Sequence, residues 1–255
     1  MSYMDLPARH KELLNLIGQK KRIPVSELSQ SLSVSEVTIR KDLNQLAQQG
    51  YLRREHGYAV LLESDDTAKH LSFNHERKSA IARRAAISVC DGETVMIESG
   101  GCCSLLAEEL VKTHKHITII TNSAFIAAYI RRQNGARIIL LGGEYQHDSQ
   151  VMVGPMLQRC VAGLAVDKLF IGTDGCNETG FMTNDEDRAA ATQAMADHAK
   201  NIIILTESEK FLRTGRIPLI AYDRLAMVYT DDQLTGDTRT EMEERGVPLI
   251  LARTR

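Results

Sequence analysis

The sequence lacks the features of exported, membrane-spanning and disulfide-rich proteins. No stretch approaches the roughly 20 apolar residues that a membrane-spanning helix requires, and the first ten residues lack the apolar core of a secretory signal. The five cysteines are odd in number and none forms a Cys-x-x-Cys pair, so neither a disulfide framework nor a zinc site is indicated. We therefore expect a cytoplasmic protein with reduced thiols, no metal and no cofactor.

Internal repeats and low-complexity segments are also absent, and the length instead indicates two domains. The 255 residues, 43% hydrophobic and 25% charged, are typical of globular proteins and exceed what one small domain needs. The formal net charge of −2 is unevenly distributed. Residues 1–60 carry nine Lys/Arg against six Asp/Glu, which is +3 and leaves −5 for the rest. A phosphate backbone would therefore bind at the N-terminal end.

The N-terminal segment has the pattern of a helix-turn-helix. Apolar residues recur at helical spacing over about 6–17, and Gly18 follows as the expected C-terminal cap. Ser26 is the expected N-cap of a second, short helix. A turn at residues 33–34 then leads to Ser35, which can cap a third helix.

The third helix carries side chains suited to reading DNA on the side away from its apolar stripe. Arginine and asparagine make bidentate hydrogen bonds to guanine and adenine, lysine pairs with phosphate or guanine, and an exposed valine can meet a thymine methyl. Ser35 and Thr38 near the helix N-terminus could hold phosphates. The alternative is that Ser35 is only a cap and Thr38 only a helix-surface residue, with Arg40 and Lys41 as solvated charges that pair with Glu36. The expected base-reading side chains are Val37, Arg40, Lys41 and Asn44.

A basic hairpin is expected directly after this helix. Residues 50–62 read as two short strands that turn near Gly57. Arg53, Arg54 and His56 could straddle a phosphate backbone or a minor groove, although His56 could equally be an inert turn residue. Together with the helices, this wing predicts a winged helix-turn-helix domain over residues 1–62.

These segments resemble the N-terminal signature of the DeoR family of bacterial repressors. Asp42 differs in role from its neighbours, because an acid in a DNA-reading helix would repel phosphate. We expect it to orient a neighbouring arginine or to cap a backbone group. The residues of this chain that match the N-terminal DeoR signature are Arg9, Leu13 and Ile17, then Ser35-x-x-Thr38-Ile39-Arg40-Lys41-Asp42-Leu43, then Arg54-Glu-His-Gly57.

The rest of the chain has the pattern of an α/β domain. Residues 63–74 are polar without a sustained apolar period and are the expected linker. Over residues 75–255 apolar runs alternate with helical patterns, which predicts a doubly wound parallel sheet covered by helices. The expected strands are 94–97, 117–120, 137–141, 168–171, 202–205, 227–229 and 249–251. The expected helices are about 75–89, 104–111, 124–132, 185–199 and 235–244.

Polar, glycine-bearing loops follow five of the expected strands. Ligands of such sheets bind beyond the carboxyl ends of the strands, and the first loop leads into a helix N-terminus, which presents N–H groups to a phosphate. Each loop alone is weak evidence, since Gly-Gly is a common turn. Five convergent loops indicate a pocket for an anionic small molecule. The loops are residues 98–104, 121–123, 142–144, 172–175 and 206–211.

The DeoR resemblance extends over these loops and so over nearly the whole chain. It implies an effector domain similar to the ribose-5-phosphate isomerase and CoA-transferase fold, with a phosphorylated sugar as effector. It also implies a phosphate loop, polar residues that line the site and meet sugar hydroxyls, and a lysine that faces the ligand charge. The implied effector-binding residues are Ser99, Gly100, Gly101, Cys102, Cys103 and Ser104 in the loop, then Asn122, Gly142, Gly143, Asp174, Asn184, Glu186 and Lys210.

The phosphate loop departs from the family pattern. Family members usually carry an Asp and a run of threonines where this chain has Glu98 and Gly101-Cys102-Cys103. Hydroxyl donors are therefore missing unless Ser99 and Ser104 supply them. Thiols near a helix N-terminus can have a lowered pKa and sense oxidants. Alternatively, cysteine is simply a small side chain where the backbone approaches a ligand.

The resemblance implies a transcriptional regulator, a repressor of a carbohydrate-use operon that binds operator DNA and responds to a sugar phosphate. Palindromic operators favour a homo-oligomer, a dimer or a larger even assembly. Two alternatives stay open. One is an isomerase or acyl-transferase fused to a DNA-binding domain, with Glu98, Asp174 and Glu186 as acids or bases. The other is a DNA-binding oligomer with no small ligand.

Overall fold

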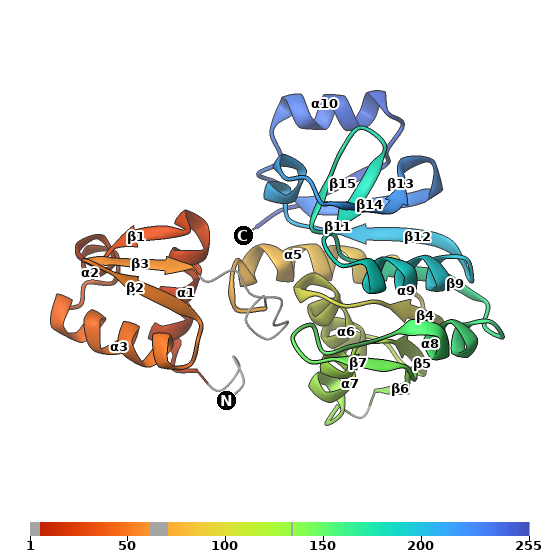
Figure 1. Ribbon diagram of the computed structural model, residues 1–255, viewed down its shortest axis with the longest axis horizontal. Helices are drawn as coiled ribbons and strands as arrows, with labels where there is room; N and C mark the ends of the chain where they lie inside the picture. Colours follow the sequence, from red (N-terminus) through yellow and green to blue (C-terminus); the bar gives the residue numbers. More distant parts are fainter. Residues whose placement is uncertain (1–5, 62–70, 134, 255) are drawn as a thin grey trace. The chain divides into compact units, whose positions relative to one another are not determined.

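The computed structural model describes residues 6–61, 71–133 and 135–254 (Figure 1). Its internal contacts divide the chain into two compact units, Met1–His75 and Glu76–Arg255. Residues 62–70, which make up most of the expected linker, lie outside the described residues. None of the helices in the described ranges is long and apolar enough to cross a membrane.

The N-terminal unit is a winged helix-turn-helix, which confirms the expected fold. Its helices are α1 (Ala8–Lys20), α2 (Val25–Leu32) and α3 (Glu36–Gln48). Its strands are β1 (Arg22–Pro24), β2 (Leu52–Glu55) and β3 (Tyr58–Leu61). The strands form an antiparallel sheet in the order β1-β3-β2, in which β2 and β3 are the wing. The sequence pattern did not predict β1, because three residues are too few to show an alternation.

Two expected helix ends in this unit are wrong. Gly18 lies inside α1, which continues to Lys20. Its lack of a side chain serves packing, since a Cβ there would lie 3.2 Å from the Cβ of Phe73. Ser26 lies in the first turn of α2, which follows Pro24 and has no side-chain cap.

The core of the N-terminal unit fixes which side of α3 faces outward. Ile39, Leu43 and Leu46 on α3 are fully buried. They belong to one apolar cluster with Leu13 and Ile17 of α1. The opposite side of α3 is therefore left to solvent, as its helical periodicity predicts.

The C-terminal unit is built on a parallel sheet, as expected. Its strands are β4 (Thr94–Ile97), β5 (Ile117–Thr121), β6 (Ala136–Leu140), β9 (Val166–Ile171), β12 (Ala199–Leu205), β14 (Leu225–Asp231) and β15 (Leu249–Ala252). The seven strands lie in the order β15-β14-β12-β9-β4-β5-β6, and every neighbouring pair is parallel. Near-continuous apolar runs produce this arrangement, because strands buried on both faces need them.

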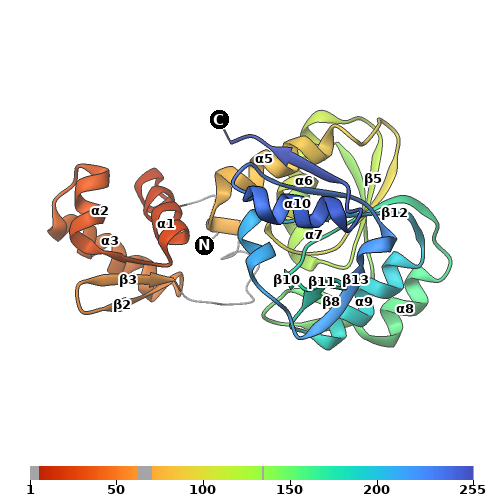
Figure 2. The same ribbon diagram turned by 90° about the horizontal axis from the view of Figure 1, so that it is seen from above.

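The strand order reverses between β4 and β9. From β4 the chain proceeds to β5 and β6 on one side, and later from β9 to β12, β14 and β15 on the other. Right-handed connections then place α6 and α7 on one face of the sheet and α9 on the other (Figure 2). The helices are α5 (His75–Ala86), α6 (Gly101–Thr113), α7 (Ala124–Ile130), α8 (Gly154–Val161), α9 (Glu186–Ala196) and α10 (Gly236–Glu244).

Several short elements of this unit were not predicted. β7 (Glu144–Gln146) and β8 (Val151–Val153) form a hairpin that leads into α8. β10 (Gly175–Cys176), β11 (Gly180–Thr183) and β13 (Ile217–Ala221) form a separate antiparallel sheet. Strands of two to five residues carry too few positions to show a period.

Candidate functional sites

The N-terminus of α3 is capped as the sequence predicts. The Ser35 hydroxyl accepts a hydrogen bond from the backbone N–H of Thr38 at 3.4 Å. The Ser35 and Thr38 hydroxyl oxygens are also 3.0 Å apart. Both hydroxyls therefore lie at the positive end of the α3 dipole, where a DNA phosphate would be stabilised.

The outer face of α3 presents the residues expected to read bases. Val37 is 77% exposed, so its side chain is accessible to a thymine methyl. Arg40, Lys41 and Asn44 are also exposed. Arg40 forms an ion pair with Glu36 at 2.7 Å, as the alternative interpretation anticipates. Exposed pairs contribute at most about 1 kcal/mol, so this contact leaves Arg40 available to a base.

The wing is joined to α3 by a hydrogen bond. Arg54 on β2 donates to the side-chain oxygen of Asn44 on α3. Arg53 pairs with Glu55 at 2.8 Å, and His56 is exposed in the turn. The basic side chains of the wing and the polar face of α3 therefore form one continuous surface.

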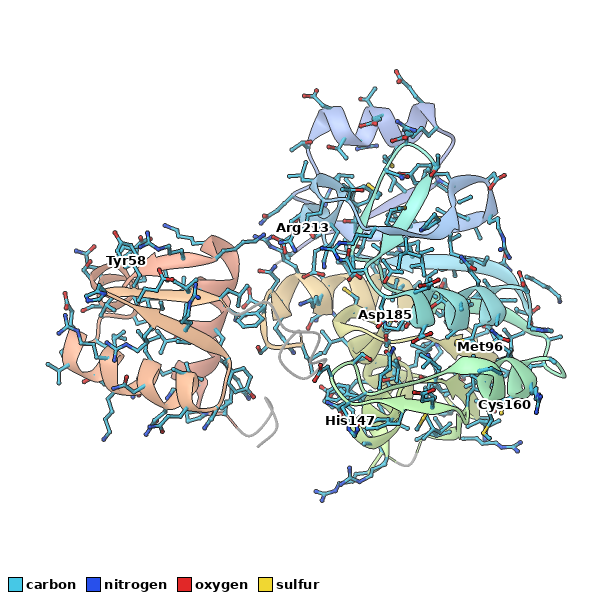
Figure 3. The ribbon with its side chains drawn as sticks, viewed as in Figure 1. Tyr58, Met96, His147, Cys160, Asp185 and Arg213 are labelled. Carbon is cyan, nitrogen blue, oxygen red and sulfur yellow. The ribbon has the colours of Figure 1, made fainter. Side chains whose placement is uncertain are left out.

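A third strand supports the wing next to its turn. The Arg22 guanidinium on β1 lies 3.7 Å from the centre of the ring of Tyr58, which Figure 3 labels on β3. The Arg22 Nε is 3.5 Å from the carboxylate of Glu55. These contacts tie β1 to the middle strand β3 and to the other outer strand β2.

Asp42 has the structural role that the sequence predicts. It is buried, and its carboxylate accepts hydrogen bonds from Arg9 Nε at 2.5 Å and Arg9 Nη2 at 3.1 Å. His10 Nε2 lies 3.3 Å from the same carboxylate. Burial raises the pKa of Asp42, but the hydrogen bonds from Arg9 and His10 outweigh it and hold that pKa below its usual value. The charged carboxylate thus joins α3 to α1.

The reversal of strand order marks the expected binding position of the C-terminal unit. In open α/β sheets ligands bind outside the carboxyl ends of the two strands that flank the reversal, here β4 and β9. We call the loops after these strands, Glu98–Gly101 and Gly172–Gly175, the switch-point site. The two loops touch, because a Cβ on Gly172 would lie 3.3 Å from the Ser99 carbonyl oxygen.

The side chains of the phosphate loop already bond within the protein. Ser99 donates to Glu98 Oε1 at 2.6 Å, and Ser104 donates to the Gly100 carbonyl at 2.8 Å. Ser104 is fully buried, whereas Gly100, with a φ of 101°, is partly exposed. An anion at this loop would therefore meet the free N–H groups of the first turn of α6 and not these two hydroxyls.

The two cysteines of α6 are poorly suited to redox sensing. Burial raises the pKa of the Cys102 thiol well above its ordinary value, and Glu207 raises it further. Burial and Glu98 do the same to the pKa of Cys103. Because the thiolate is the reactive form, these environments favour the interpretation of small side chains next to a ligand-binding backbone.

Asp174 is charged and ordered at the switch-point site. Its carboxylate accepts hydrogen bonds from the Thr183 hydroxyl and the Asn184 backbone N–H, both at 3.0 Å. Burial would raise the pKa of Asp174, but Arg188, Lys210 and these hydrogen bonds hold that pKa below its usual value. The expected residues Asp174, Asn184 and Lys210 thus come together. Glu186 is exposed on α9.

Arg188 is a site residue that sequence reasoning missed. It lies in the first turns of α9, whose N-cap Asp185 is labelled in Figure 3 and accepts a hydrogen bond from the Arg188 backbone N–H at 2.8 Å. The Arg188 guanidinium lies 3.5 Å from Ser99 Oγ and 3.9 Å from Glu98 Oε1. One sequence signal could have identified it, since it is the cation that directly follows the predicted ligand-binding stretch of residues 184–186 at the start of a helix.

The expected residues Asn122, Gly142 and Gly143 lie against β8 and α8. Asn122 is fully buried and donates to the Met152 carbonyl at 3.1 Å. A Cβ on Gly143 would lie 2.5 Å from the Val153 carbonyl oxygen, so only glycine fits there. The two glycines follow β6, two strands away from β4.

The loop after β12 holds Lys210 and a buried ion pair. Glu207 in this loop lies 3.2 Å from the ammonium of Lys78 on α5, and both side chains are more than 90% buried. Ser208 is fixed by two 2.8 Å hydrogen bonds to Asp231. Sequence reasoning also missed Lys78, because its partner is more than a hundred residues away. The pair connects the first helix of this unit to a loop beside the switch-point site.

Comparisons with known proteins agree with this architecture. Residues 9–65 match the DeoR-like helix-turn-helix domain, and residues 73–232 match the DeoR C terminal sensor domain. The chain is 28% identical to the glycerol-3-phosphate regulon repressor of Escherichia coli K12, over 89% of this chain and 92% of that protein. It is 28% identical to the lactose phosphotransferase system repressor of Staphylococcus aureus N315, over 94% of this chain and 99% of that protein.

Part of the chain also aligns with a solved enzyme structure. Ribose 5-phosphate isomerase A from Neisseria gonorrhoeae aligns with 14% identity and a TM-score of 0.40, over 56% of this chain and 54% of that one. Both parts of the chain match family models, and together these cover most of its length. The protein therefore belongs to the DeoR family.

Proposed function

We propose that the protein is a DNA-binding transcriptional repressor of a carbohydrate-use operon, and that a phosphorylated sugar at the switch-point site changes its affinity for the operator. One observation carries the proposal. The exposed face of α3 places Arg40, Lys41 and Asn44 next to the basic wing through the Arg54–Asn44 hydrogen bond. This surface suits a major groove with a flanking backbone.

The relatives and the charges of the C-terminal unit support the second half of the proposal. One relative is named for glycerol-3-phosphate and another for a lactose phosphotransferase system. Here Arg188 and Lys210 both act on Asp174 beside a helix N-terminus. Cations and free N–H groups bind a phosphate, and the carboxylate of Asp174 can accept hydrogen bonds from sugar hydroxyls.

The mechanism requires a coupling free energy between the two sites. The sugar phosphate must bind more tightly to one arrangement of the protein than to another, because equal affinity would shift nothing. A homodimer or larger even assembly would match a palindromic operator. A catalytic role is disfavoured, since Glu98 and Asp174 are already engaged by hydroxyl and amide hydrogen bonds.

The proposal is tested by binding of the full-length protein to the DNA upstream of its own gene. Affinity is measured at one fixed, physiological salt concentration, because phosphate contacts depend steeply on salt. A panel of phosphorylated sugars is then added. Specific binding that one member of the panel weakens or strengthens supports the proposal. Binding that no member alters favours a ligand-free regulator, and absence of specific binding at low salt contradicts DNA recognition.

A further inference from the structure

Arg188 is placed at the point where the sheet reverses its strand order. Its guanidinium contacts the loop after β4, at 3.5 Å from Ser99 Oγ, and it is the cation with the largest effect on Asp174 in the loop after β9. Its side chain is 19% exposed. A partly open, charged group between both flanking loops is positioned to meet a ligand there.

Lys78 and Lys210, two further cations of this region, are placed differently. Lys78 is buried in its pair with Glu207. Lys210 follows β12 and affects both Asp174 and Cys102, so it lies toward the next strand of the sheet. Arg188 contacts the phosphate loop at Ser99, whereas Lys210 acts farther along it, at Cys102.

Glu98 holds the Arg188 guanidinium only loosely. The Glu98 carboxylate is buried and accepts the Ser99 hydroxyl at 2.6 Å, whereas Arg188 Nη2 is 3.9 Å away. A direct ion-pair hydrogen bond would be about 2.7–2.9 Å. The guanidinium carries five N–H donors in a fixed fork, a geometry that matches two oxygens of a phosphate with parallel donors.

A buried acceptor on the neighbouring strand also indicates a ligand. The Asn122 side-chain oxygen is buried, and within the described part of the chain it has no hydrogen-bond partner. Thr121, the preceding residue, donates its hydroxyl to the Glu98 carbonyl at 3.3 Å, so Asn122 lies beside the same loop. Buried acceptors normally have a donor, and a sugar hydroxyl would supply one.

We infer that Arg188 is the residue that binds the phosphate of the effector and selects phosphorylated over unphosphorylated sugars. The inference rests on the proposed function, because it names the recognition chemistry of the same switch-point site. It specifies a phosphate monoester, whose oxygens match the paired donors of a guanidinium.

The test is a cycle of two changes, Arg188→Gln in the protein and removal of the phosphate from the sugar. Full-length wild type and variant are titrated calorimetrically with the sugar phosphate identified in the operator assay and with the unphosphorylated sugar. The variant should bind the sugar phosphate about 10- to 100-fold more weakly. It should bind the unphosphorylated sugar as the wild type does, and its operator affinity without effector should not change. Arg188→Lys, which keeps the charge but not the fork, should give an intermediate loss.

Arg239→Gln is the matched control, since Arg239 is an exposed helix arginine paired with Glu243 at 2.8 Å. If Arg188→Gln binds the sugar phosphate within twofold of the wild type, the inference is wrong. An equal loss of affinity for the phosphorylated and the unphosphorylated sugar would assign Arg188 a purely structural role, and the inference would again be wrong. A wild type that binds no phosphorylated sugar would instead overturn the proposed function, and the inference with it. Should Arg188→Gln fail to fold, the Arg188→Lys cycle decides by the same criteria.

Discussion

At the scale of single residues, the DNA-binding surface combines exposed side chains with weak local contacts. Arg40 illustrates this, because its ion pair with Glu36 is exposed on both sides. Such a pair fixes the side chain only weakly. A base edge in the major groove offers stronger, bidentate hydrogen bonds. Arg40 can therefore exchange Glu36 for DNA at little cost.

Arg40→Ala should weaken operator binding by about 1–3 kcal/mol if Arg40 reads a base. The measurement is a titration of operator DNA at fixed salt, with Arg239→Ala as a control that removes an equally exposed helix arginine. The control should bind as the wild type does. An Arg40→Ala variant with unchanged affinity would remove Arg40 from the recognition surface.

At the scale of secondary-structure elements, the recognition helix is held by a buried carboxylate. Asp42 connects α3 to α1 through Arg9 and His10. This contact accounts for an acid in the middle of a DNA-reading helix, since the carboxylate faces the core and not the phosphates. The charged form of Asp42 therefore stabilises the packing of α3 against α1.

Asp42→Asn should lower the thermal unfolding midpoint of the N-terminal unit. Because the folded-state pKa of Asp42 is lowered, its stabilisation is complete above the unfolded-state pKa of about 4. It is lost as the pH falls through the folded-state pKa. Thermal unfolding followed by circular dichroism should therefore show a lower midpoint for the variant than for the wild type, and this difference should disappear in acid. Asp223→Asn is the control, because Asp223 is exposed, and it should unfold at the same midpoint as the wild type. A difference in midpoint for Asp42→Asn that does not change with pH would contradict this role of Asp42.

A second link between elements is the buried pair of Lys78 on α5 and Glu207 after β12. Removing one partner of a buried pair leaves a charge without its counterion and costs about 3–5 kcal/mol. Lys78→Met should destabilise the C-terminal unit by roughly this amount in urea unfolding. The double variant with Glu207→Leu should recover much of the loss. Equal stability of wild type and Lys78→Met would show that the pair contributes little.

At the scale of the whole molecule, the sequence predicts the fold better than the site. The winged helix-turn-helix and the parallel strands follow from helical periodicity and from apolar runs, which are local signals. The short antiparallel strands β10, β11 and β13 have no such period. Arg188 and Lys78 could not be assigned either, because their roles depend on contacts with Ser99 and Glu207, about ninety and more than a hundred residues away in the sequence.

The two units carry the two halves of the proposed function, and the central claim is that they are energetically coupled. Coupling is reciprocal by thermodynamic necessity. If a sugar phosphate changes operator affinity by some factor, the operator must change sugar-phosphate affinity by the same factor. A typical coupling of about 1–3 kcal/mol corresponds to roughly a 5- to 150-fold change.

The most direct measurement is therefore calorimetric titration of the sugar phosphate into the free protein and into its operator complex. Each result is compared with the operator affinity measured with and without the sugar phosphate. Energetic coupling predicts that the ratio of the two sugar-phosphate affinities equals the ratio of the two operator affinities, and that both ratios differ clearly from one. Equal sugar-phosphate affinities for the free and the operator-bound protein would contradict it, because the two sites would then be independent.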